Sequence, residues 1–326
     1  MNVRLFIALV ASSFILSQGM FAAPGVSPGD STSTLSKEGY IAVNGTRLFF
    51  TTLGKGDPLV IIHGGPGLDH TYLLPQMAAL AARNTLIFFD QRASGKSALG
   101  VDSNSMSMAT FVEDIEGIRK AFGLKKMNLF AHSWGGLLAM YYAIKYPDRL
   151  NSLILSNSSP ASSSFRRASF KIMQQRTSRD DSLAGAALIG TEGFKERDAM
   201  VMERSFRILF RSGFADPRYA DSLTLTLPDD YAARNKSLQY LFKDTLATNY
   251  DITDRLKVIQ CPVLILGGTD DFIPPEATAQ LAAAIPGARL ITLKRSGHFP
   301  FVDQQHDFVE AVQTFLEGVP RTGNAR

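Results

Sequence analysis

The chain has 326 residues, which fits one α/β unit with an inserted subdomain better than a minimal domain or two full ones. Hydrophobic residues make up 45% of it and charged residues 20%, which excludes a mostly disordered chain. The formal net charge is +4, without a block of like charges, and this argues against nucleic-acid binding. The single cysteine, Cys261, excludes an internal disulfide and a cysteine zinc cluster.

The first residues have the three-part layout of a secretory signal peptide. A positive start with Arg4 precedes an apolar stretch at 5–16, and two small residues follow at 22–23. The apolar stretch is short for a bilayer, and no later run reaches the ~18 apolar residues of a membrane helix. We therefore expect a signal peptide at 1–23 rather than a retained anchor, and an exported protein, periplasmic or secreted. A flexible segment rich in Gly, Pro, Ser and Thr is expected at 24–39.

From residue 40 onward, strand and helix patterns alternate along the chain. The first two strands flank Asn44-Gly45, a dipeptide that supplies the positive φ of a tight hairpin turn. The expected strands are 40–43, 47–52, 59–62, 85–89, 127–131, 153–155, 263–266 and 289–293. The expected helices are 72–82, 108–122, 134–146, 275–284 and 303–316. Strands that alternate with helices predict a mostly parallel sheet covered on both faces.

A long stretch after residue 158 interrupts this alternation. It opens with a polar, serine-rich run at 158–164 and contains an amphipathic helical segment at 200–210. We interpret it as a helical lid over a pocket, although a helix that only packs on the sheet would show the same pattern. The expected domains are a core at 40–158, a lid at 159–248 and the rest of the core at 249–320.

Ser133 stands between a predicted strand and a predicted helix, in the string Ala131-His132-Ser133-Trp134-Gly135. This is the context of a nucleophile elbow, a turn so sharp that the residues two positions from the serine must be small. Gly135 meets that demand, and Ala131 takes the place of the usual first glycine. The helix N-terminus behind Ser133 adds a positive dipole end for developing negative charge.

A serine hydroxyl needs a base to accept its proton and a third group to orient that base. Of the five histidines, only His298 lies at the tip of a late strand, before the last predicted helix. For the acid, Asp271 is preferred on its spacing from the preceding glycine, and Asp270 remains the alternative. The chain order Ser133, Asp271, His298 is the serine–acid–histidine order of α/β-hydrolases.

The predicted strand at 59–62 runs into the string His63-Gly64-Gly65-Pro66-Gly67. Glycines at a strand tip let backbone N–H groups approach a substrate closely. We expect the Gly65 N–H to form half of an oxyanion hole and the Trp134 N–H to complete it. Each such donor typically stabilises a transition state by about 2.7–4 kcal/mol. A tight turn alone would explain the glycines, but not their place beside a nucleophile elbow.

The string Gly95-Lys96-Ser97 invites interpretation as a phosphate-binding loop. That loop needs a glycine where Asp90 stands, so ATP binding is rejected. Asp90 and Arg92 are expected to brace the loop near the pocket. We expect no cofactor, and no metal, because no histidine–carboxylate pair has suitable spacing.

Taken together, these strings resemble the proline iminopeptidase-like branch of the α/β-hydrolase superfamily. The glycine-rich loop at 63–67, the block at 90–97, the Ser133 elbow and the Asp271 and His298 segments carry the resemblance. It implies an α/β-hydrolase fold with an inserted helical lid and cofactor-free hydrolysis through an acyl-enzyme. The implied substrate is a small molecule or short peptide, from which an N-terminal residue is cleaved. In peptidase members, a negatively charged lid region binds the free amine of the substrate.

The sequence departs from the peptidase pattern at two places. Phe272 follows the expected acid, where such peptidases often have an acidic residue, and 237–241 lacks the expected Asn-Glu pair. Glu192, Glu196 and Glu203 are the lid carboxylates that could substitute. A carboxylesterase for small or apolar esters is therefore the alternative, and a non-catalytic ligand-binding protein of the same fold is the rival from another class.

Overall fold

The computed structural model describes residues 36–241 and 249–320 of the chain. The expected signal peptide at 1–23 lies outside the described residues, as does most of the expected flexible segment at 24–39. Within the described part of the chain, no helix is both long enough and apolar enough to cross a bilayer.

A hairpin opens the described chain and corrects the predicted start of the fold. Strand β1 (Lys37–Val43) pairs antiparallel with β2 (Thr46–Leu53) along its whole length. Asn44 and Gly45 form the turn, with φ angles of 45° and 75°, the left-handed values that this dipeptide favours. The expected flexible segment therefore ends before residue 37, since β2 offers hydrogen-bonding partners to all of β1.

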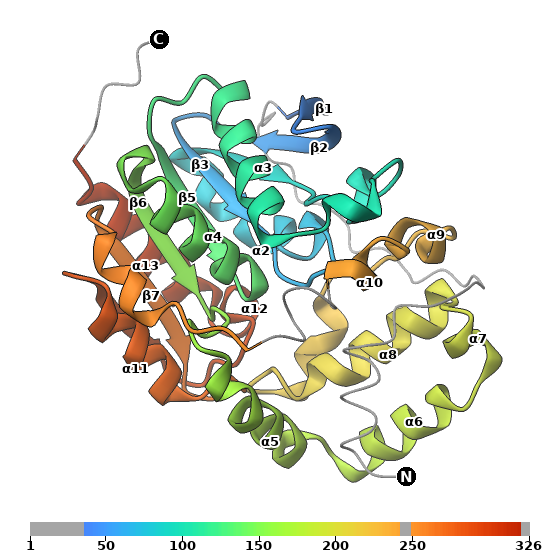
Figure 1. Cartoon of the computed structure of the whole chain (residues 1–326). Helices are drawn as coiled ribbons and strands as arrows, with labels where there is room; N and C mark the ends of the chain where they lie inside the picture. Colours follow the sequence, from blue (N-terminus) through green and yellow to red (C-terminus); the bar gives the residue numbers. More distant parts are fainter. Residues whose placement is uncertain (1–35, 242–248, 321–326) are drawn as a thin grey trace.

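One eight-stranded sheet forms the core, with the strand order β1-β2-β4-β3-β5-β6-β7-β8 (Figure 1). The remaining strands are β3 (Asp57–Ile62), β4 (Asn84–Phe89), β5 (Met127–His132), β6 (Leu150–Ser156), β7 (Val263–Gly268) and β8 (Arg289–Leu293). β2 pairs antiparallel with β1 and β4, and every other neighbouring pair is parallel. The predicted mostly parallel sheet is confirmed.

Helices cover both faces of this sheet, as Figure 1 shows, with α3 (Met108–Ala121) and α4 (Trp134–Lys145) in front and α13 (Gln305–Glu317) behind. α11 (Pro275–Ala284) connects β7 to β8. The apolar run 59–62 of β3 is fully buried, because a parallel strand in the middle of a covered sheet meets side chains on both faces.

The helix expected at 72–82 is interrupted in the structure. It consists of one short α-helix, α2 (Leu74–Met77), between two 3₁₀ turns. Pro75 is the cause, because proline has no N–H to donate and is tolerated only in the first turn of an α-helix. The helix therefore cannot run back through Tyr72.

The last helix is also divided, which differs from the single helix expected at 303–316. α12 (Pro300–Asp303) and α13 are separated by Gln304, whose φ of −140° and ψ of 56° are not helical. Asp303 ends α12 at this bend, and its carboxylate accepts hydrogen bonds from outside the helix.

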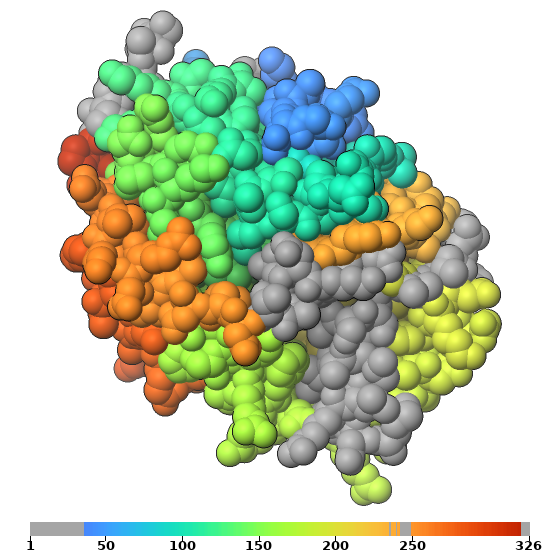
Figure 2. All heavy atoms as spheres, viewed as in Figure 1, coloured from blue at the N-terminus to red at the C-terminus, as the bar shows by residue number. Residues whose placement is uncertain are grey.

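A set of helices follows β6 and precedes β7 in the sequence, and it lies on one side of the sheet (Figure 1). They are α5 (Arg166–Arg176), α6 (Arg179–Ile189), α7 (Glu192–Lys195), α8 (Ala199–Arg211), α9 (Tyr231–Asn235) and α10 (Leu238–Leu241). Figure 2 shows the α9–α10 segment against core residues near 100, where Ser237 Oγ donates to Val101 O at 3.2 Å. We refer to this helical insertion, 159–241 in the described chain, as the lid.

Candidate active site

Ser133 occupies a strained turn between β5 and α4. Its φ of 55° and ψ of −121° are outside the favoured regions for a residue with a side chain. The turn requires a close approach at Gly135, where a Cβ would lie 2.6 Å from the His63 carbonyl oxygen. The Ser133 N–H donates to Ser156 O at 3.1 Å, which fixes the turn to the end of β6. The side chain is half-buried and therefore accessible to solvent.

His298 lies in the loop between β8 and α12 and contacts both other expected residues. Its Nε2 is 2.9 Å from Ser133 Oγ, and its Nδ1 is 2.9 Å from Asp271 Oδ1. Because an ionised carboxylate only accepts hydrogen bonds, we assign the proton to Nδ1, which leaves Nε2 as an acceptor for the serine hydroxyl. The structure thus brings together the three residues that the sequence selects.

The structure also separates the two candidate acids. Asp271 follows β7 and is buried, and its Oδ1 also accepts the Ile273 N–H at 3.0 Å. The Asp270 carboxylate instead lies 3.5 Å from Arg176 Nη1 and accepts the Thr269 hydroxyl at 2.8 Å. The geometry therefore selects Asp271 as the partner of the imidazole.

Asn157 is a site residue that sequence reasoning missed. Its Nδ2 donates to Asp271 Oδ2 at 2.8 Å and to the Gly297 carbonyl at 2.9 Å. It holds a left-handed φ of 47° directly after β6. Its place after a parallel strand, at the same sheet edge as Ser133, is the only sequence signal that could have indicated it.

The segments that carry the two expected oxyanion donors lie beside the serine. At Gly64 a Cβ would be 3.1 Å from Ser133 Cβ, so the loop passes very close to the nucleophile. Gly65 has a φ of 125° and is exposed. Trp134 is the first residue of α4, where backbone N–H groups have no acceptor within the helix. Its indole donates to Gln91 Oε1 at 3.1 Å, which fixes its orientation.

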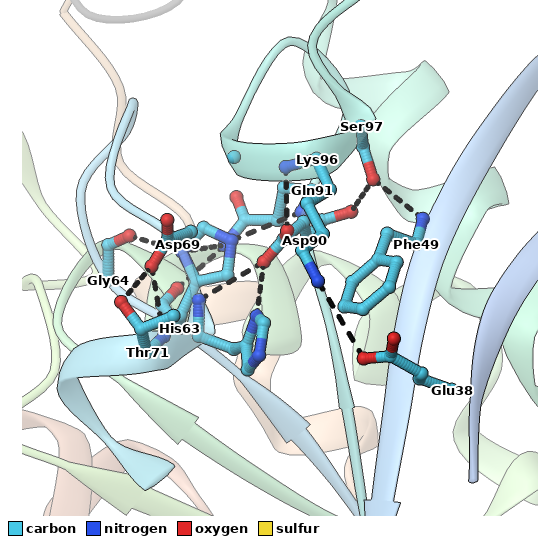
Figure 3. A network of polar contacts seen from close by, with 12 residues as sticks. Glu38, Phe49, His63, Gly64, Asp69, Thr71, Asp90, Gln91, Lys96 and Ser97 are labelled. Atoms are coloured by element: carbon cyan, nitrogen blue, oxygen red, sulfur yellow. Dashed lines mark hydrogen bonds and ion pairs between the residues drawn. The ribbon is translucent and has the colours of Figure 1, made fainter. Parts of the chain in front are cut away.

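Figure 3 shows a polar network that includes Asp90 and reaches Gly64 of the glycine-rich loop. The Asp90 carboxylate lies 2.6 Å from His70 Nδ1 and accepts the Lys96 N–H at 2.8 Å. Burial raises the pKa of Asp90, but the hydrogen bond and the charge of His70 outweigh it and hold this pKa below its ordinary value. Gly95 packs directly against this carboxylate, because a Cβ at Gly95 would lie 2.5 Å from Asp90 Oδ2. The Gly-Lys-Ser string is therefore a structural turn around Asp90.

Arg92 braces the same region from its other side. Its Nε donates to Asp114 Oδ2 at 2.6 Å and its Nη2 to Asp114 Oδ1 at 2.5 Å, and both side chains are buried. Its Nη2 also donates to the Asn44 carbonyl at 3.3 Å. This bidentate pair joins the segment after β4 to α3 and to the first hairpin.

A second missed feature connects the oxyanion loop to His298. The Gly64 N–H donates to Tyr72 OH at 2.6 Å, and this hydroxyl lies 2.7 Å from His132 Nδ1. His132 Nε2 lies 2.8 Å from the His298 carbonyl and must donate to it. Burial lowers the pKa of His132 well below its ordinary value, so the ring is neutral and Tyr72 donates to Nδ1. His132 does not contact the nucleophile, but it supports the main chain of His298.

Aromatic rings surround the imidazole of His298. The ring centroid of Phe272 lies 4.1 Å away, and that of Phe299 5.3 Å away. Phe299 also stacks on Phe214 of the lid at 4.7 Å. The position after the acid, which is often acidic in peptidases, therefore presents an apolar face to the site.

The lid carboxylates that could bind an amine are largely paired or exposed. Glu192 Oε2 lies 2.7 Å from Lys195 Nζ, and Glu203 Oε1 lies 3.0 Å from Arg207 Nη2. Glu196 is exposed. Two of the three candidates thus already have a cationic partner.

One group of potential metal ligands occurs among residues 36–241 and 249–320. It consists of His306, Asp307 and Glu310 on α13, all exposed, and it is remote in sequence from the elbow. Exposed acidic groups of this kind are common without an ion. The site around Ser133 instead has the arrangement of a catalytic triad, in which a base contacts a hydroxyl and is oriented by a carboxylate.

Comparison with known proteins agrees with this geometry. A family model described as alpha/beta hydrolase fold matches residues 57–305. A proline iminopeptidase from Lactobacillus delbrueckii subsp. bulgaricus is 30% identical over 274 residues, which cover 79% of this chain and 89% of the relative.

Solved structures show the same fold. The crystal structure of a proline iminopeptidase from Mycobacterium smegmatis matches with a TM-score of 0.65 at 22% identity, covering 86% of this chain and 98% of the other. An esterase from Rhodococcus sp. ECU1013 matches with a TM-score of 0.65 at 21% identity, covering 87% and 99%. The chain therefore belongs to the alpha/beta hydrolase fold family, in its proline iminopeptidase-like branch.

Proposed function

We propose that the protein is an exported serine hydrolase in which Ser133 is the nucleophile, His298 the general base and Asp271 the residue that orients it. The observation that carries this proposal is the continuous contact from Asp271 through His298 to Ser133, with 2.9 Å at each step. The strained elbow supports it, because a backbone held in an unfavourable conformation is typical of a functional position. Export rests on the signal-peptide pattern at 1–23.

In the proposed mechanism, Ser133 Oγ attacks a carbonyl carbon while His298 Nε2 accepts the hydroxyl proton. The Gly65 and Trp134 N–H groups stabilise the oxyanion of the tetrahedral intermediate. His298 then gives the proton to the leaving amine or alcohol, and an acyl-enzyme remains on Ser133. A water molecule, deprotonated by His298, attacks this ester and releases the acid, which restores the serine.

The leading substrate is the amide of an N-terminal residue in a small peptide. The curated relative that is 30% identical over most of its length is named a proline iminopeptidase, and this supports a peptide substrate. The acyl group would then be the N-terminal residue itself.

A carboxylesterase is the second candidate, and specific observations favour it. Glu192 and Glu203 are paired with cationic neighbours, and Phe272 presents an apolar ring beside His298. These pairs leave an amine fewer free carboxylates, whereas an apolar acyl group would pack against the Phe272 ring. A likeness in fold to an esterase is consistent with this candidate.

Substitution of Ser133 by Ala tests the proposed nucleophile. Because no other hydroxyl contacts His298 Nε2 among the described residues, we expect turnover to fall by a factor of about 10⁴ or more with an unchanged melting temperature. The assay uses purified mature protein with proline p-nitroanilide and a series of p-nitrophenyl esters, which also separates the two substrate classes.

Histidine variants supply the matched control. His298→Ala should be as inactive as the serine variant, while His306→Ala, whose side chain is fully accessible on α13, should retain full activity. Undiminished turnover by the Ser133→Ala variant would overturn the proposal.

A further inference from the structure

The lid contacts the loop that carries His298, and the contact is made by main-chain atoms of both segments. The His298 N–H donates to the carbonyl of Gly213, in the turn that follows α8, at 2.5 Å. At Gly297 a Cβ would lie 2.2 Å from the same Gly213 oxygen, so no side chain fits between the two segments. We call residues 212–215 the lid turn and residues 296–298 the histidine loop.

Asp303 holds these two segments together. Its Oδ2 accepts the Gly297 N–H at 2.7 Å, and its carboxylate lies 3.3 Å from the Ala215 N–H, another donor. The residue reaches this position because the bend at Gln304 ends α12 directly after Asp303. One carboxylate thus binds an N–H group adjacent to His298 and an N–H group of the lid turn.

Arg176 binds the lid turn from the opposite side. Its Nε donates to Ser212 O at 2.8 Å and its Nη2 to Phe214 O at 2.6 Å. Its Nη1 lies 3.5 Å from Asp270, whose own N–H donates to Ser296 O at 2.8 Å. Asp270, the acid that does not contact His298, therefore also connects the lid turn to the histidine loop, through Arg176 on one side and Ser296 on the other.

We propose that Asp303 is a positioning residue for catalysis, which fixes the imidazole of His298 through the Gly297 main chain and couples it to the lid turn. This inference rests on the proposed function of His298 as the general base. Asp303 does not contact the reacting atoms. It acts by restricting the loop, so that the imidazole stays within reach of both Ser133 and Asp271.

The ionisation of Asp303 separates this role from a purely structural one. Burial raises the pKa of Asp303 to about 6, although its two N–H donors and Arg176 lower it, and Asp270 raises it further. A raised pKa means that its contribution to stability is present at low pH and is lost as the pH rises through about 6. At pH 8 the charged carboxylate therefore lowers the free energy of unfolding, and a neutral residue of the same shape avoids this loss.

Asp303→Asn is the variant that tests the inference, because an amide keeps the shape and one acceptor oxygen but not the charge. The readout is the rate at which a fluorophosphonate probe modifies the enzyme, which requires no knowledge of the natural substrate. We expect this rate to be about tenfold lower at pH 8, with a melting temperature equal to or above that of the unmodified sequence.

The pH dependence provides the decisive signature. As the pH falls through about 6, Asp303 of the unmodified sequence becomes neutral itself, so the tenfold difference between the two proteins should shrink toward one. Asp307→Asn on the exposed surface of α13 is the matched control and should label at the normal rate.

The outcomes distinguish this inference from the proposed function. Equal labelling rates at pH 8, or a slower rate that is independent of pH and accompanied by a lower melting temperature, would overturn the positioning role alone. If the probe does not modify the unmodified sequence and no ester or anilide is turned over, the proposed function fails, and the positioning role fails with it.

Discussion

Asn157 shows how much of the site depends on single side chains outside the triad. Its amide connects Asp271 Oδ2 to the carbonyl of Gly297, so it fixes the acid and the histidine loop at once. It also tolerates the left-handed backbone that the end of β6 requires there. These two properties can be separated by substitution.

We predict that Asn157→Gly lowers kcat/KM by roughly tenfold. Glycine accepts the positive φ, so the loss isolates the hydrogen bonds, and a factor of ten corresponds to about 1.4 kcal/mol, the scale of one net hydrogen bond. Asn44→Gly is the matched control, because Asn44 also has a positive φ but its amide binds Thr110 O and Asp114 rather than Asp271 and Gly297. Equal kcat/KM values for the two glycine variants would contradict the role of the amide.

The sequence was sufficient to select Ser133 and His298, because each lies at a strand end with a recognisable neighbourhood. It left Asp271 and Asp270 as alternatives, since adjacent residues differ only in the direction of their side chains, which the turn after β7 decides. Asn157 and Asp303 were missed because they act on main-chain groups far away along the chain. Such contacts have no local pattern.

Among the secondary-structure elements, β5 and the 3₁₀ turn at His70–Tyr72 carry the connection between the oxyanion loop and His298. Tyr72 precedes α2 and His132 ends β5, and their hydrogen bond joins the Gly64 N–H to the His298 carbonyl. All of these side chains are buried, so each donor and acceptor depends on its partner.

We predict that Tyr72→Phe destabilises the fold and slows labelling by the fluorophosphonate probe. The substitution leaves His132 Nδ1 and the Gly64 N–H without a partner, and each such group costs about 1–3 kcal/mol. Tyr142→Phe is the control, because the buried hydroxyl of Tyr142 donates to Glu116 at 2.9 Å, between α4 and α3. It should lower the melting temperature without slowing the labelling, and equal labelling of both variants would refute the connection.

Strand and helix positions were predicted well where periodicity or an apolar run is strong, as in β3, α3 and α11. The predictions were wrong where a local restraint overrides the pattern. Pro75 interrupts the helix expected at 72–82, and the bend at Gln304 divides the one expected at 303–316. Both deviations place side chains, Tyr72 and Asp303, against the site.

The molecule as a whole combines a sheet whose order was predictable with a lid whose contacts were not. Alternating strands and helices predict a parallel sheet on general grounds, and that prediction is confirmed. The contacts of the lid depend on single residues such as Arg176 and Arg207, whose main-chain partners no periodicity identifies.

The buried histidines make a prediction about acid stability. Burial lowers the pKa of His132 well below the ordinary value of 6.5 and also lowers that of His63, so their contribution to stability is present above that pH and is lost as the pH falls. The raised pKa values of Asp303, about 6, and of Asp114 act in the opposite direction. His70, whose pKa is raised despite burial because of Asp90, is charged in both states at that pH.

We predict that the free energy of unfolding falls between pH 7 and pH 5, because the two buried histidines take up protons on unfolding. Urea unfolding at pH 7 and at pH 5 measures it. The exposed His306→Ala variant should show the same fall as the unmodified sequence. A free energy of unfolding that is equal or higher at pH 5 would contradict the neutral state assigned to the two histidines.

Peptide mapping by mass spectrometry after reaction with a fluorophosphonate probe identifies the nucleophile directly. We predict one covalent adduct per chain, on the Oγ of Ser133, and its disappearance in the His298→Ala variant because the base is lost. An adduct on another serine, or the absence of any adduct from the folded protein, would contradict it.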